Sequence, residues 1–116
     1  MRLLFSSALS ALVALAVSVG LAVPALAQDA RAAGEKVYAE QKCAVCHAVG
    51  GKGNAKGPLD EVGSKLTADE IRAWITDAKA MTVKTKAARK PEMKAYTLPK
   101  EEVDGLVTYL SGMKKK

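Results

Sequence analysis

The segment Cys43-Ala44-Val45-Cys46-His47, called the pentad below, contains both cysteines and the only histidine of this 116-residue chain. Two thiols with this spacing can form thioether bonds to the two vinyl groups of one porphyrin. The histidine that follows is then held beneath the ring, where an imidazole nitrogen can bind the iron. The pentad therefore predicts one covalent c-type haem, bound by Cys43, Cys46 and His47.

Two other chemistries use a Cys-x-x-Cys pair. A thiol–disulfide redox centre belongs in a thioredoxin-like strand–helix–strand context, and the sequence shows no such alternation. A zinc site needs about four cysteine, histidine or carboxylate ligands, and the pentad supplies three. Both comparisons favour haem attachment.

Residues 1–27 have the parts of a secretory signal peptide. Arg2 provides a positive start, residues 9–23 are almost entirely apolar, and Ala25-Leu26-Ala27 fits a cleavage site. An uncleaved anchor is the alternative, but the apolar run is short for a bilayer span. We therefore predict a periplasmic domain of residues 28–116 without a stable membrane span. Export agrees with the pentad, because thioether attachment requires thiols that are managed in an oxidising compartment.

Helix start signals and apolar periodicity predict an all-α fold. Asp29 can cap a helix that runs to about Lys42. Thr67-Ala68-Asp69-Glu70 is a capping box that begins a second helix. Pro99 suits the first position of a third. The three predicted apolar faces are Ala30, Ala33, Gly34, Val37 and Tyr38; Ile71, Trp74, Ile75 and Ala78; and Val103, Leu106, Val107 and Leu110.

Residues 79–96 are predicted to form a long loop. This segment contains Met81 and Met93, and its basic side chains are Lys79, Lys84, Lys86, Arg89, Lys90 and Lys94, against the single acid Glu92. Loops of this length in a small domain are usually functional or disordered. We expect this one to cover an edge of the haem.

The order of these features resembles the small class I monohaem c-type cytochromes. An N-terminal helix leads into the pentad, followed by Gly57-Pro58-Leu59, a middle helix, a methionine-containing loop and the amphipathic segment 98–110. The resemblance covers residues 28–116. It implies three or more helices wrapped around one covalently attached haem c, and single-electron transfer between periplasmic redox proteins.

The single histidine excludes a second histidine as an iron ligand within one monomer, which leaves a methionine, a lysine or an open position. The resemblance implies Met93, because the ligand in this family lies just before the C-terminal helix. Met81 is the competing candidate and can instead fill the core. Many relatives have proline directly after the ligand, whereas this chain has Lys94.

The resemblance also implies roles for residues around the haem. It places the crossing of the N- and C-terminal helices at Gly34, with Tyr38, Leu106 and Tyr109 around it. The backbone carbonyl beside Pro58 would accept the proton on the second nitrogen of His47, orienting the imidazole. Trp74 is either a partner of a haem propionate or part of the core.

Two functions follow from this reading. The first is a diffusible electron carrier, and the second is the haem subunit of a periplasmic oxidoreductase complex. We expect no catalysis by this chain alone, because no Ser/His/Asp set or carboxylate pair is identifiable. The chain has 18 basic and 12 acidic residues, so the lysines either steer it toward acidic redox partners or simply keep it soluble. We expect no nucleic-acid partner, and a monomer or a subunit of a hetero-complex.

Covalent attachment has a direct test. We predict that acid–acetone extraction leaves the colour with the polypeptide, because thioether bonds survive a treatment that removes non-covalent haem. Replacing Cys43 and Cys46 by serine removes both bonds, so the double variant is expected to carry no covalent haem. A colourless wild-type pellet would contradict the assignment.

Overall fold

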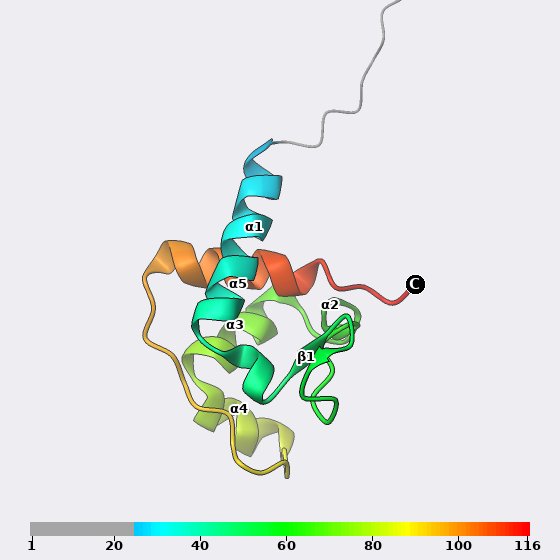
Figure 1. Ribbon diagram of the computed structural model, residues 1–116. Coiled ribbons are helices and arrows are strands. Elements are labelled where there is room, and N and C mark those ends of the chain that lie inside the picture. Colours follow the sequence, from blue (N-terminus) through cyan, green and yellow to red (C-terminus); the bar gives the residue numbers. More distant parts are fainter. Residues whose placement is uncertain (1–24) are drawn as a thin grey trace, which may run out of the picture.

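The computed structural model describes residues 25–116, and within them helices dominate (Figure 1). The elements are α1 (Ala25–Glu40), the 3₁₀-helix η1 (Cys43–Val45), β1 (Ala48–Val49), β2 (Lys52–Gly53), α2 (Val62–Lys65), α3 (Ala68–Thr76), α4 (Ala78–Thr85) and α5 (Lys100–Ser111). The predicted helical fold is confirmed. The two short strands were not predicted, and they pair antiparallel with Ala48 opposite Gly53.

Helices α1 and α5 cross in close contact, and α5 passes across the middle of α1 in Figure 1. A Cβ atom added to Gly34 would overlap the carbonyl group of Gly105, so the two backbones touch at this point. The rings of Tyr38 and Tyr109 pack edge to face beside the crossing, with centroids 5.8 Å apart. The crossing that the family resemblance implied is therefore present.

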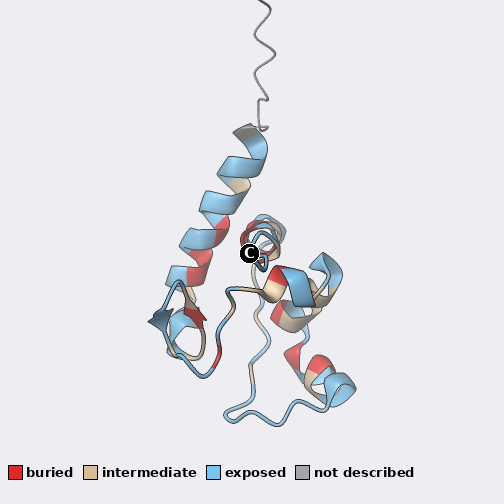
Figure 2. Ribbon diagram, turned by 90° about the vertical axis from the view of Figure 1, so that its right-hand side faces the viewer, coloured by how far each residue is buried: buried red, intermediate tan, exposed pale blue. Residues whose placement is uncertain are grey.

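The core forms where α1, α3 and α5 meet. Its buried residues are Val37, Tyr38, Ile71, Ile75, Val103, Leu106, Val107, Tyr109, Leu110 and Met113. All four residues of the predicted α5 face are buried, and so are Ile71, Ile75 and Ala78. On α1, burial is confined to the second half (Figure 2). Ala33 is exposed there, so the buried face of α1 is narrower than predicted.

The helix ends match two of the start signals closely. The capping box is present, because Thr67 Oγ1 accepts from the Glu70 amide and Glu70 Oε1 accepts from the Thr67 amide, both at 3.2 Å. Pro99 directly precedes α5 as its N-cap residue. The prediction for Asp29 is wrong, because α1 already begins at Ala25 and Asp29 lies inside it. Helix α1 ends at Glu40, before Lys42, which has a left-handed conformation with φ of 55°.

The predicted long loop is also corrected. Its first part is helix α4, which begins where Asp77 accepts a hydrogen bond from the Ala80 amide. Only Ala78 and Met81 are buried on α4, and a buried face this narrow leaves no clear apolar stripe from which to predict a helix. The connection between α4 and α5 is thereby reduced to residues 86–99.

No helix within residues 25–116 is long and apolar enough to cross a membrane. Most of the predicted signal peptide lies outside the described residues. Its last three residues, Ala25-Leu26-Ala27, form the first turn of α1.

The helix crossing can be tested by two matched Gly→Ala substitutions. Gly34→Ala inserts a methyl group between two backbones in contact, and overpacking of this kind costs about 1–3 kcal/mol. Gly112→Ala is the control, because the nearest atom to its Cβ would be at 3.5 Å. We expect guanidinium unfolding of the holo-protein, followed by circular dichroism, to show a loss of stability for Gly34→Ala only. Equal midpoints for the two variants would contradict a close crossing.

Candidate functional site

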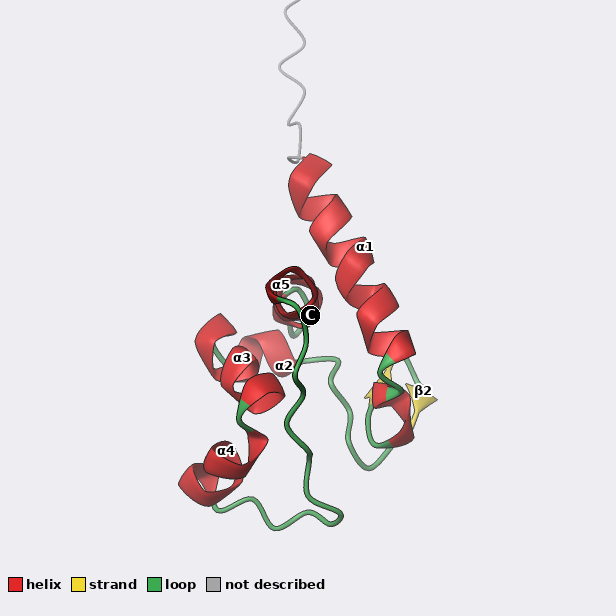
Figure 3. Ribbon diagram, turned by 90° about the vertical axis from the view of Figure 1, so that its left-hand side faces the viewer, coloured by secondary structure: helices red, strands yellow, loops and turns green. Residues whose placement is uncertain are grey.

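The pentad lies in one tight turn at the end of α1, beside the β1–β2 hairpin (Figure 3). The amides of Cys46 and His47 both donate to the Cys43 carbonyl, at 3.1 and 2.9 Å. Both cysteines are half-buried, and they do not form a disulfide with each other. The turn thus places two thiols and an imidazole on five consecutive residues, with their backbone fixed by its own hydrogen bonds.

The imidazole of His47 is oriented by the segment that follows the hairpin. Its Nδ1 lies 3.1 Å from the carbonyl oxygen of Gly57, which leaves Nε2 as the nitrogen that can bind a metal. The same Gly57 carbonyl accepts a bond from the Ala48 amide at 3.0 Å, and the Leu59 amide donates to the Ala48 carbonyl at 2.8 Å. The bond that the resemblance implied next to Pro58 is therefore confirmed.

Burial and a nearby positive charge favour the neutral form of this imidazole. Burial lowers the pKa of His47, the Gly57 hydrogen bond opposes that change, and the positive charge of Arg89 lowers the pKa further. A neutral imidazole is the form that can donate a lone pair to a metal. Burial also raises the pKa of the Cys43 thiol.

The donor set fits a c-type haem better than the two alternatives. Among residues 25–116, no three side chains of histidine, cysteine, aspartate or glutamate are grouped closely enough to hold a metal ion, which gives a zinc site no support. The sheet in this part of the chain is a two-stranded antiparallel hairpin, so the thioredoxin-like context is missing as well. Two thiols and an imidazole with an oriented ring remain, and these are the groups that haem attachment requires.

The two candidate methionines lie in different surroundings. Met81 is buried on α4, with 5% of its surface exposed, outside the core formed by α1, α3 and α5. Met93 is half-buried in the connection 86–99. Three residues later the Tyr96 amide donates to the Ile75 carbonyl at 2.8 Å, at the end of α3. Tyr96 and Cys43 are both half-buried and pack against the same hydrophobic core, so the segment after Met93 and the start of the pentad adjoin one core.

Two side chains at the pentad were missed by sequence reasoning. The Asn54 side-chain amide donates to the Val45 carbonyl at 3.2 Å, and the Asn54 backbone amide donates to both Ala44 and His47 carbonyls. Arg89 Nη2 donates to the Cys46 carbonyl at 2.5 Å. An asparagine in a glycine-rich segment is a weak signal for such a role, and nothing in the spacing pointed to Arg89.

The remaining predicted residues are exposed or half-buried. The basic residues of segment 79–96 are all exposed: Lys79, Lys84, Lys86, Arg89, Lys90 and Lys94. Lys90 pairs with Glu92 at 2.6 Å, and Lys94 Nζ lies 5.1 Å from the centre of the Tyr96 ring. Trp74 is half-buried on α3, and its role as a propionate partner stays a prediction.

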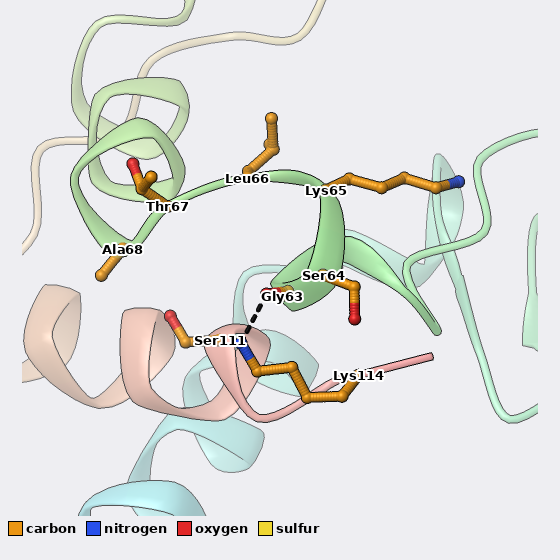
Figure 4. A pocket seen from close by; sticks show the side chains of 8 residues that line it. All are labelled: Gly63, Ser64, Lys65, Leu66, Thr67, Ala68, Ser111 and Lys114. Carbon is orange, nitrogen blue, oxygen red and sulfur yellow. Dashed lines mark hydrogen bonds between the residues drawn. The ribbon is translucent and has the colours of Figure 1, made fainter. Parts of the chain in front are cut away.

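A separate pocket of about 410 Å³ lies between the α2–α3 turn and the end of α5 (Figure 4). Its lining includes Ser64, Thr67 and Ser111, and Lys114 Nζ donates to the Gly63 carbonyl at its edge, at 2.5 Å. No residue of the pentad lines it. The pocket is therefore formed where the C-terminal segment meets the α2–α3 turn, and it is separate from the site described above.

Comparison with known proteins agrees with this geometry. The family model described as Cytochrome c matches residues 31–114, and the chain belongs to this family. The family implies covalently bound haem c, electron transfer through that haem and redox protein partners.

Among curated proteins, the chain is similar to the cytochrome c oxidase subunit 2 of Alkalihalophilus pseudofirmus. The two are 29% identical over 90 residues, which covers 70% of this chain and 25% of that protein. The chain thus spans about a quarter of the length of this relative. No solved structure matches the chain.

Proposed function

We propose that this chain transfers single electrons between periplasmic redox partners on one haem c, held by Cys43 and Cys46 with His47 and Met93 as iron ligands. The observation that carries the proposal is the pentad turn, in which His47 Nδ1 is bound by the Gly57 carbonyl. The bound haem supplies the ferric–ferrous couple. The chain itself catalyses no reaction in this proposal.

The protein groups act by holding and tuning this couple. Two thioether bonds make the haem inseparable from the carrier, which suits a protein outside the cytoplasm. The Gly57 hydrogen bond fixes the ring orientation of His47 and makes the imidazole a stronger donor. The thioether of Met93 is a soft ligand that favours ferrous iron, so His/Met ligation raises the reduction potential.

The exposed basic residues of segment 79–96 suit encounter with acidic partners. All six are exposed, and one of them is paired with the single acid of this segment. Positive charge near the redox site accelerates association with partners that present acidic surfaces. A monomeric carrier that meets such partners briefly is the simplest form of this function.

A second candidate is the haem subunit of a periplasmic oxidoreductase complex. It is favoured by the similarity to an oxidase subunit, although the chain spans only a quarter of that protein. In this form the partner chain would carry out the chemistry and pass electrons to the haem.

The iron ligand is tested by comparing Met93→Ala with Met81→Ala. Loss of the Met93 thioether is expected to lower the reduction potential by on the order of 100 mV or more, within the ~0.8 V range that axial ligands span. Its sulfur-to-iron absorption band is expected to disappear. Met81→Ala is expected to leave both unchanged and to cost about 2–5 kcal/mol of stability, because a buried side chain is removed. Reversed results would make Met81 the ligand, and two unchanged spectra would exclude methionine ligation.

Free carrier and complex subunit are separated by size. Size-exclusion chromatography of periplasmic extract, followed by haem absorbance, is expected to show a single small species if the chain is a diffusible carrier. Elution with a larger complex that persists at high salt would instead support the subunit. High salt is the control, because it weakens encounters held together by surface charge alone.

A further inference from the structure

Arg89 joins two parts of the chain that are distant in sequence. Its Nη2 donates to the Cys46 carbonyl at 2.5 Å, across a separation of 43 residues. One end of this contact is in the pentad, directly before His47. The other end is in the connection 86–99, which also carries Met93. The bond therefore ties the segment of one proposed iron ligand to the backbone beside the other.

The same guanidinium lies against Gly57. A Cβ atom at Gly57 would overlap Nη1 of Arg89 as well as the Cys46 carbonyl, so all three groups are in close contact. Gly57 is also the residue whose carbonyl binds His47 Nδ1. Arg89 thus contacts both backbone segments that flank the hydrogen bond of the imidazole.

Arg89 differs in position from the other basic residues of segment 79–96. All six are exposed, but the Arg89 guanidinium donates to a carbonyl of the pentad and lies against Gly57. Its position, and not only its charge, therefore distinguishes Arg89 from its neighbours.

We infer that Arg89 is a positioning residue that clamps the connection 86–99 onto the His47 side of the site and raises the reduction potential of the bound haem. A fixed positive charge favours the redox state with one positive charge fewer, which is the ferrous state. Arginine suits this role because it stays charged and its planar group can contact two carbonyl-bearing segments at once. The inference rests on the proposed function.

The test compares three variants of the holo-protein by voltammetry and by guanidinium unfolding. Arg89→Gln removes the charge, Arg89→Lys keeps it, and Lys56→Gln is the control, because Lys56 is an exposed neighbour of Gly57. We expect Arg89→Gln to shift the ferric–ferrous equilibrium toward ferric iron by about two- to fivefold, which is about 18–41 mV at 59 mV per tenfold. Arg89→Lys is expected to retain at least half of the difference in reduction potential between the wild type and Arg89→Gln. Lys56→Gln is expected to leave the reduction potential unchanged.

Several outcomes would overturn the inference. Equal shifts for Arg89→Gln and Lys56→Gln would mean that only the net charge matters. A lower unfolding midpoint with an unchanged potential would leave Arg89 a structural contact alone. If Arg89→Gln fails to fold, Arg89→Lys decides the question. A drop in its reduction potential as large as the one expected for Arg89→Gln would contradict the inference, because Arg89→Lys keeps the charge. Acid–acetone extraction of the wild-type protein tests the proposed function separately, because it does not depend on Arg89.

Discussion

The backbone contact between α1 and α5 is the constraint on which the site depends. Gly34 and Gly105 have no side chains, and this lets the two helices approach until their backbones touch. The contact fixes the direction of α1, and the pentad begins three residues after that helix ends. The aromatic pair Tyr38 and Tyr109 then fills the space beside the crossing. A small domain has a thin margin of stability, so one close crossing both forms the core and positions the haem-binding turn.

A second requirement for close approach lies around the pentad itself. Gly53 has a φ of 108°, and a Cβ there would overlap the His47 carbonyl. Gly57 is closed in by the Cys46 carbonyl and Arg89. The glycine-rich segment after the pentad therefore folds back over it as a tight hairpin, in which Asn54 binds the pentad backbone. The glycine-rich composition of this segment suggests a flexible loop. In the structure, the segment instead supports the imidazole.

Features set by residues close together in the sequence could be predicted, whereas contacts between distant residues could not. The pentad, the capping box at Thr67 and the apolar face of α5 were predicted, because each depends on residues within a few positions of one another. Helix α4 was missed, since a helix that buries only Ala78 and Met81 shows almost no periodicity. Asp29 is a favourable N-cap residue type, but α1 begins four residues before it. The bond of Arg89 to Cys46 joins residues too far apart for any spacing to reveal, whereas the His47–Gly57 bond was reached only through the family resemblance.

The two segments that carry the proposed iron ligands are linked by packing and hydrogen bonds, and not by chain connectivity. The pentad belongs to the end of α1, and Met93 lies in the connection before α5, so each is attached to one of the two crossing helices. Within the described chain, the connection is held by the Tyr96 amide on the Ile75 carbonyl and by Arg89 on the Cys46 carbonyl. Both bonds end on backbone carbonyls, whose positions are set by the surrounding fold. A change at the α1–α5 crossing would therefore act on the pentad and on the Met93 segment together. The redox site is in this sense a property of the whole domain, even though its attachment signature occupies five residues.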